Sequence, residues 1–174
     1  GHTYITAGSG PDGYLFSPWL IAHEHSHQFL HQFMNVSCMR YYDRPGAWIN
    51  EALASYCETV IIVADRVAFA GYRDNHHFRQ SMSLAKEAGL KPLAEFVNLD
   101  GRQYGPDSRF AYFQGMALTS YLLHSNDGKY RKAYYKYIQD VVMGKGTKTR
   151  FEGCFGIKPD VMEQDFLEFL LSSK

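Results

Sequence analysis

Five consecutive residues, His23-Glu24-His25-Ser26-His27, match the pattern H-E-x-x-H. On an α-helix, residues four positions apart project from the same face, so His23 and His27 can bind one zinc ion together. Glu24 then lies beside the ion, where it can take a proton from a water in the open position of the metal. The sequence therefore predicts Zn²⁺ as the cofactor, with His23 and His27 as ligands and Glu24 as the general base.

The segment that carries this motif has the features of a buried helix. Ser17 and Pro18 are typical of a helix start, and residues 18–36 contain many large apolar side chains. We expect such a helix to be buried over most of its circumference. Buried imidazoles need polar partners, and a zinc ion would supply them. The alternative is a helix whose histidines are satisfied by hydrogen bonds alone.

A catalytic zinc site needs a third protein ligand as well as one open position. His31 lies two helical turns from His23, a rise of about 12 Å, so we expect it at the rim of the site rather than on the same ion. The extended pattern H-E-x-x-H-x-x-G-x-x-H fails, because Leu30 and Phe33 occupy its last two defined positions. The remaining candidate is Glu51, which follows a turn-rich stretch and lies on a second helix that can fold back onto the first.

With Glu51 included, the chain resembles a known family. H-E-x-x-H followed by W-x-N-E-x-x-A at residues 48–54 is similar to the gluzincin class of zinc metallopeptidases. The match is to the wider peptidase-MA-like group, which includes bacterial domains of poorly defined function. The resemblance implies that His23, His27 and Glu51 bind the metal and that Glu24 is the general base. The loop between the two motifs is longer here than in the aminopeptidase branch of the class.

A second segment extends the resemblance. Tyr112-Phe113-Gln114-Gly115 is similar to the Y-x-x-G segment that follows the third ligand in gluzincin aminopeptidases. There the tyrosine hydroxyl stabilises the oxyanion of the tetrahedral intermediate, and Tyr112 would take that role because a phenol can donate a hydrogen bond to developing negative charge. The alternative is an ordinary core tyrosine in a chain that contains thirteen of them.

One part of the aminopeptidase pattern is missing. Those enzymes carry a G-x-M-E-N segment on an edge strand upstream of the zinc helix, and its glutamate binds the free amine of the substrate. Residues 3–10 contain no such motif, so the resemblance does not support exopeptidase specificity. The segment is open to two interpretations, an edge strand that binds an extended peptide or, because of its glycines, a loop.

Other polar residues are candidates for orienting the ligands. Asn50, Ser55 and Glu58 lie on or beside the second helix, and Glu58 is the best carboxylate to hold an imidazole. His124 is expected too far along its helix to reach the cleft. His76-His77 opens a helix and is expected to be an exposed helix start, so we assign it no catalytic role.

The hydrophobic pattern predicts a mainly α fold (α+β). Residues 1–174 are expected to form a single zincin-like metallopeptidase catalytic domain, the helical half of a thermolysin-like fold with a small N-terminal β element. Because the chain begins abruptly at Gly1, we expect it to be part of a longer chain. A surface loop is predicted at 101–108. Helices are predicted at about 18–36, 47–70, 76–88, 109–125, 128–143 and 159–172, with shorter helical turns at about 92–98 and 147–154.

Composition restricts the partners. The net charge is zero and the pI is near neutral, which argues against a nucleic-acid partner. The sequence contains no run of about twenty apolar residues that would predict a transmembrane segment. No signal peptide is visible. Localisation stays open, although the family resemblance favours a secreted or cell-envelope protein. Cys38, Cys57 and Cys154 form no C-x-x-C motif and leave either one disulfide or three free thiols.

The predicted function is zinc-dependent hydrolysis of peptide bonds in a peptide or protein substrate, through a metal-activated water with Glu24 as general base. The main alternative is a catalytically silent, zinc-binding gluzincin-like domain with a binding or assembly role. Two others stay open, a metal-free helical domain and a zinc hydrolase that acts on a non-peptide amide. Cleavage specificity, endo- or exopeptidase action and oligomeric state are left undetermined.

Overall fold

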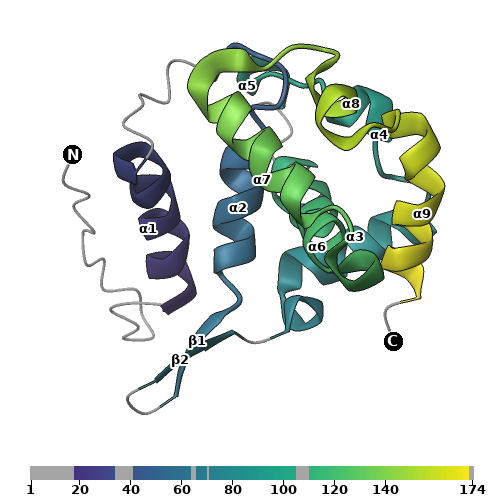
Figure 1. Cartoon of the computed structure of the whole chain (residues 1–174). Helices are drawn as coiled ribbons and strands as arrows, with labels where there is room; N and C mark the ends of the chain where they lie inside the picture. The colour runs from purple at the N-terminus through teal and green to yellow at the C-terminus, as the bar shows by residue number, and fades with distance from the viewer. Residues whose placement is uncertain (1–17, 34–40, 64–65, 70, 105–109, 173–174) are drawn as a thin grey trace.

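The computed structural model describes residues 18–33, 41–63, 66–69, 71–104 and 110–172, and within them the fold is mainly α-helical (Figure 1). The predicted mainly α class is therefore confirmed, while the predicted N-terminal β element lies outside the described residues. None of the described helices is long and apolar enough to cross a membrane. The elements in chain order are α1 (Pro18–Phe33), α2 (Ile49–Cys57), β1 (Val60–Val63), β2 (Arg66–Phe69), η2 (Tyr72–Asp74), α3 (His76–Lys86), α4 (Leu93–Phe96), α5 (Gly101–Tyr104), η4 (Phe110–Gln114), α6 (Gly115–His124), η5 (Ser125–Gly128), α7 (Arg131–Asp140), η6 (Val141–Lys145), α8 (Arg150–Phe155) and α9 (Pro159–Leu171).

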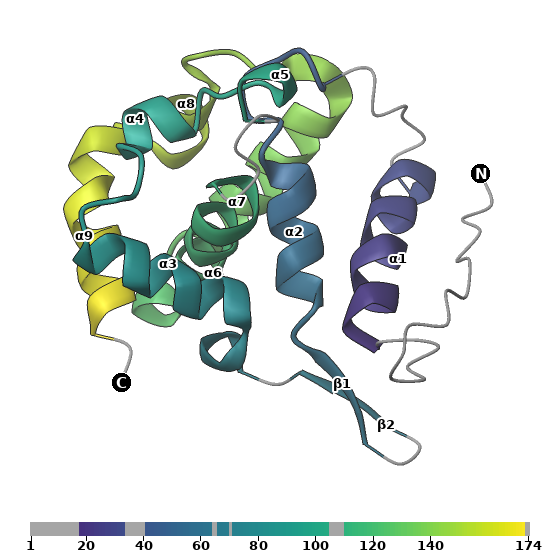
Figure 2. The ribbon, with the colours of Figure 1, turned by 180° about the vertical axis from the view of Figure 1, so that it is seen from behind.

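The predicted helix over 47–70 is wrong in its second half. Helix α2 ends at Cys57, and the chain then forms an antiparallel hairpin in which Val60 pairs with Phe69 and Val63 with Arg66. The run Val-Ile-Ile-Val consists of β-branched residues, which lose side-chain freedom in a helix and favour a strand. The described strands therefore lie in the middle of the chain, and the hairpin extends away from the helices (Figures 1 and 2).

Helix α2 occupies the centre of the arrangement and packs against α1 on one side and α6 on the other (Figures 1 and 2). Trp48, just before α2, is fully buried, with its ring 5.2 Å from that of Phe96 and 6.3 Å from that of Tyr137. Nine consecutive residues of α6, Gly115–Leu123, are buried as well. The helix that carries Glu51 is thus anchored in the main hydrophobic core.

Helix α1 differs from its prediction. Among its described side chains only that of His23 is buried, whereas Trp19, Leu20 and Phe29 are 48%, 39% and 63% exposed. The expected burial over most of its circumference is therefore wrong. The face of α1 that packs on α2 carries the histidines of the H-E-x-x-H motif, so the polar motif faces inward and large apolar residues face outward.

Gly115 sets the distance between α2 and α6. A Cβ atom added at Gly115 would lie 2.8 Å from the Cβ of Ala52 on α2, closer than two carbon atoms can pack. Overpacking of this kind costs about 1–3 kcal/mol, and we expect Gly115→Ala to lower the free energy of unfolding by that amount in urea titrations. Gly153→Ala is the matched control, because nothing lies within 4 Å of that helical position. The control should be neutral or stabilising by up to about 1 kcal/mol, and equal effects of the two changes would contradict the close-packing explanation.

The structure decides part of the choice between one disulfide and three free thiols. Cys57 and Cys154 are both free thiols, so these two do not form a disulfide with each other. Cys38 lies outside the described residues.

Candidate metal centre

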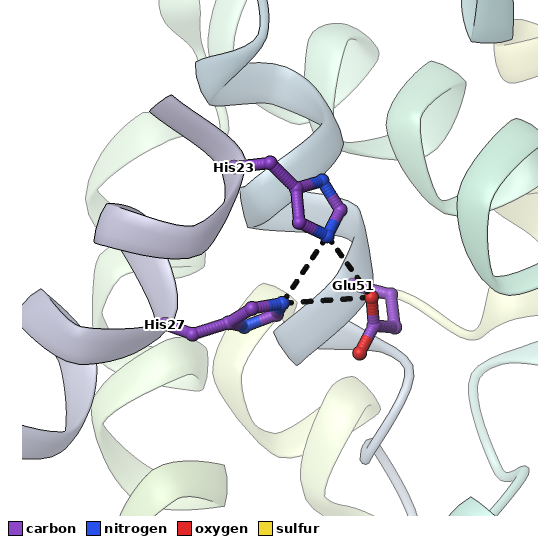
Figure 3. A group of neighbouring side chains, drawn as sticks. All are labelled: His23, His27 and Glu51. Carbon is purple, nitrogen blue, oxygen red and sulfur yellow. Dashed lines mark hydrogen bonds and ion pairs between the residues drawn. The ribbon is translucent and has the colours of Figure 1, made fainter. Parts of the chain in front are cut away.

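Three side chains from two helices converge between α1 and α2 (Figure 3). The Nε2 atoms of His23 and His27 lie 3.3 Å apart. The Oε2 atom of Glu51 lies 3.5 Å from Nε2 of His23 and 3.6 Å from Nε2 of His27. The structure thus brings together the three residues that the sequence proposes as metal ligands, and their donor atoms form a nearly equilateral triangle.

The dimensions of this triangle fit a tetrahedral zinc ion. Zinc binds histidine nitrogen and carboxylate oxygen at about 2.0–2.2 Å, so two ligand atoms of a tetrahedral site lie about 3.3–3.6 Å apart. The three observed separations fall in that range. Two imidazoles and one carboxylate also form a donor set that zinc favours in catalytic sites. The residues therefore fit the ion that the motif implies.

Local helix geometry places two of the three residues side by side, and packing of α2 against α1 brings the third to them. His23 and His27 are one turn apart on α1, which brings their rings to 4.9 Å. Glu51 lies in the first turn of α2, and its Oε1 atom accepts a hydrogen bond from Nδ2 of Asn50 at 3.3 Å. Tyr41 in turn donates to Asn50 at 2.9 Å. This chain of contacts holds the Glu51 carboxylate with its other oxygen facing the two histidines.

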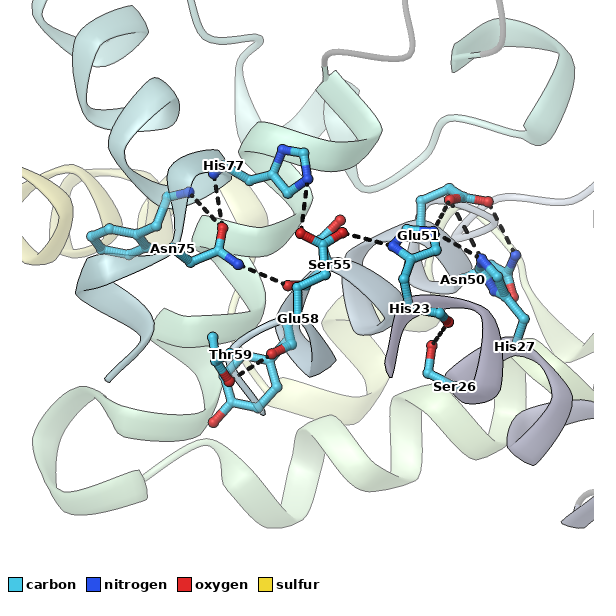
Figure 4. A network of polar contacts seen from close by, with 12 residues as sticks. His23, Ser26, His27, Asn50, Glu51, Ser55, Glu58, Thr59, Asn75 and His77 are labelled. Carbon is cyan, nitrogen blue, oxygen red and sulfur yellow. Dashed lines mark hydrogen bonds and ion pairs between the residues drawn. The ribbon is translucent and has the colours of Figure 1, made fainter. Parts of the chain in front are cut away.

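A second carboxylate orients His23 from the opposite side of its ring. Nδ1 of His23 donates to Oε1 of Glu58 at 2.7 Å, and the Glu58 side chain is only 3% exposed (Figure 4). Such a bond fixes the tautomer that leaves Nε2 free to bind a metal, and it makes that nitrogen more basic. Of the three candidate orienting residues, Glu58 and Asn50 contact the site. The hydroxyl of Ser55 does not, since it is buried and has no hydrogen-bond partner.

The charges of the cluster favour a bound cation. Burial disfavours a charge on His23, but the hydrogen bonds with Glu51 and Glu58 outweigh it and raise the pKa of His23 to about 9. Burial opposes ionisation of both carboxylates too, yet contacts with the histidines lower the pKa of Glu51 well below its usual range and that of Glu58 to about 2. Two negative carboxylates therefore flank His23, and this charge favours a divalent cation at its Nε2.

Glu24 and Tyr112 lie at the edge of this cluster. Both line a pocket of about 380 Å³ together with His23, and Trp19, Leu20 and Phe113 supply its apolar wall. No hydrogen bond or ion pair joins the Glu24 carboxylate to any residue in the described part of the chain. An uncommitted carboxylate next to a metal ligand is what a general base requires.

Tyr112 reaches the site from η4, a turn of π-helix. Its ring stacks on that of His23 at 5.9 Å, and its hydroxyl lies near the Glu51 carboxylate. Burial and the nearby charge of Glu51 raise the pKa of Tyr112 to about 12, so the phenol keeps its proton at neutral pH. A π-turn is an irregularity that often occurs at functional sites.

The structure also places a residue here that the sequence did not suggest. His77 is not an exposed helix start: its side chain is 12% exposed, its Nε2 lies 3.3 Å from Oε2 of Glu58, and its ring stacks on Tyr112 at 5.6 Å. The sequence signal for His77 is weak, because it depends on α3 packing beside α2. As expected, His31 lies away from the three ligands, with Nε2 3.2 Å from the hydroxyl of Tyr41.

Comparison with known proteins adds no relative. No family model matches the chain, and neither the curated proteins nor the solved structures contain a significant match. The resemblance to gluzincins is thus neither supported nor contradicted by similarity.

Proposed function

We propose that this chain is a zinc-dependent metallopeptidase of the gluzincin type, a thermolysin-like catalytic domain in which His23, His27 and Glu51 bind Zn²⁺. The observation that carries the proposal is the triangle of donor atoms, whose three separations of 3.3, 3.5 and 3.6 Å match a tetrahedral zinc site. The H-E-x-x-H motif alone predicts only two of these atoms. Agreement of the third, from a separate helix, supports a metal centre over a chance occurrence of the motif.

The surroundings of the triangle favour a catalytic site over a structural one. A structural zinc site is usually closed by four protein ligands, whereas in the described part of the chain only three residues converge here. Glu24, Tyr112 and His23 also line one pocket, which gives a substrate access to the cluster. A zinc-binding domain without activity would not need a carboxylate here that has no partner among the described residues.

Each residue has a role that follows from its place. When bound, zinc supplies Lewis acidity, polarising a carbonyl and lowering the pKa of a water. Glu24 takes a proton from the attacking water and later delivers it to the leaving amine. Tyr112 donates a hydrogen bond to the negative charge that develops on the carbonyl oxygen. Glu58 holds His23 through its Nδ1 proton and keeps the imidazole oriented.

The proposal is tested by adding zinc to metal-free protein and measuring cleavage of an unstructured protein such as casein and of a mixed peptide library. We expect activity that disappears with a zinc chelator and returns when zinc is restored, with about one zinc per chain bound at the proposed centre. Zinc binding at that centre without cleavage of any substrate would instead favour the silent zinc-binding domain. Absence of metal binding would remove the enzyme proposal.

Tyr112→Phe tests the oxyanion role. Loss of one hydrogen-bond donor to the oxyanion lowers kcat by about 100- to 1,000-fold in other enzymes, and we expect a loss of this order with little change in KM or zinc content. Tyr135→Phe is the matched control, because Tyr135 is 57% exposed and lies outside the pocket. A wild-type kcat in Tyr112→Phe would leave Tyr112 as a packing residue that stacks on His23.

A further inference from the structure

We propose a second divalent-cation site, formed by Glu58, His76 and His77 on the far side of Glu58 from His23. One donor atom from each of the three residues lies within 4.8 Å of the others. Glu58 directly follows α2, and His76 and His77 form the start of α3. Figure 4 shows Glu58 between His77 on one side and His23 on the other. The two groups share no ligand.

The strongest evidence is an unsatisfied oxygen. Oε1 of Glu58 accepts the hydrogen bond from His23, but Oε2 is buried and has no hydrogen-bond partner, although Nε2 of His77 lies 3.3 Å away. The Glu58 side chain is only 3% exposed. The contact with His77 is an ion pair without hydrogen-bond geometry, so this buried carboxylate oxygen is only partly satisfied, which is costly. A cation held between Glu58 and His77 would satisfy it.

The histidines are held in place by the start of α3. The side chain of Asn75 accepts hydrogen bonds from the backbone N–H groups of His77 and Phe78, which fixes the first turn of the helix. The same side chain donates to the carbonyl of Ser55 at 3.1 Å and so ties α3 to α2. This double contact places His76 and His77 next to Glu58, with the two imidazole rings 3.8 Å apart. The fold therefore positions these residues before any cation binds.

The donor set indicates the class of cation. Two imidazoles and one carboxylate suit zinc, cobalt, nickel or copper rather than magnesium or calcium, which prefer oxygen ligands. His76 is exposed, whereas all three residues of the first triangle are buried or partly buried. We expect the second site to bind the same metal more weakly than the first.

The position of the site connects it with the proposed catalytic centre. His76, His77 and Glu58 line the same pocket as Glu24 and Tyr112, so a cation bound there would lie where substrate enters. Glu58 also joins the two sites directly, one oxygen on His23 and the other on the second cation. A cation on Glu58 would weaken the hydrogen bond that Glu58 accepts from Nδ1 of His23. Binding of a metal at either site should therefore lower the affinity of the other site for its metal.

The test is a titration of the metal-free full chain with Zn²⁺ alone, against a chromophoric competitor, and with Co²⁺ followed by its visible absorption. We expect two metal ions per wild-type chain, one in the double variant His76→Ala/His77→Ala and one in Glu51→Ala. The single variant His76→Ala should weaken only the second site, by more than tenfold. His25→Ala is the control: this exposed histidine bonds to the carbonyl of Ile21 and lies in neither group, so two ions should remain.

The outcomes separate the two sites. One ion in the wild type, lost in Glu51→Ala and retained in the double variant, would overturn the second site and leave the proposed function intact. Two ions in the double variant would overturn it as well. One ion lost only in the double variant would support the second site and contradict the catalytic one. If the double variant does not fold, as judged by circular dichroism, a second-site affinity unchanged in His76→Ala would still count against the proposal.

Discussion

Glu24→Gln should lower the kcat of the zinc-loaded protein by about 100- to 10,000-fold, the range that a general base contributes. The physical reason is that an amide has nearly the same shape as a carboxylate but cannot accept the proton of the attacking water. Glu24 lines the pocket beside His23 and is not a member of the metal-binding triangle. Zinc content, measured by elemental analysis, should therefore stay at the wild-type value while peptide cleavage, measured on a fluorogenic peptide, is lost.

Glu152→Gln provides the control for this change. Glu152 is an exposed glutamate on α8, which does not line the pocket, and its substitution should leave both kcat and zinc content unchanged. Retained turnover in a purified preparation of Glu24→Gln would exclude Glu24 as the base. Loss of zinc together with turnover would show instead that Glu24 supports the metal centre itself.

Glu51→Ala should remove the metal from the centre formed by His23, His27 and Glu51. Oε2 of Glu51 is one corner of the donor triangle, 3.5 and 3.6 Å from the two histidine nitrogens. Loss of a residue that merely orients a ligand weakens metal binding by about 10- to 100-fold, so loss of a ligand should cost more than 100-fold in zinc affinity. Competition with a chelator of known affinity measures this directly, and hydrolysis should be absent at limiting zinc.

The comparison with Glu152→Ala shows whether the effect is specific, because that change removes an equal charge from an exposed position. Far-UV circular dichroism checks that Glu51→Ala is folded, which we expect because Glu51 lies beside the core and is not part of it. Wild-type zinc affinity in a folded Glu51→Ala would exclude Glu51 as a ligand. The third corner of the site would then have to come from another residue.

Some of the fold could be read from local patterns alone. The predicted helices near 76–88, 109–125 and 159–172 occur with small shifts at their ends, because caps and breakers act locally: Asn75 caps α3, and Pro159 begins α9. The hairpin that begins with Val60–Val63 differs from the predicted helix, because the apolar pattern continues past the end of α2. The β-branched run is a local signal that favours the strand.

The burial of α1 could not be read from its composition. Its apolar side chains suggested a helix enclosed by the core, yet Trp19 and Phe29 are exposed and His23 faces α2. Composition shows how many apolar residues a helix has. Which face of the helix packs against a neighbour depends on the side chains of that neighbour. Here α2 and the residue that follows it carry Glu51 and Glu58, whose carboxylates contact His23 and, for Glu51, His27.

The sequence by itself determined the chemistry of the candidate ligands. The spacing of His23 and His27 places both on one face of a helix, because side-chain direction within a helix follows from its period. The resemblance of W-x-N-E-x-x-A to the gluzincin pattern singles out Glu51. Tertiary structure alone decided the 3.3–3.6 Å triangle and the contact of His77 with Glu58. These depend on how closely α1, α2 and α3 approach one another, and that distance is set by packing and by long-range bonds such as Asn75 to Ser55, which no local pattern encodes.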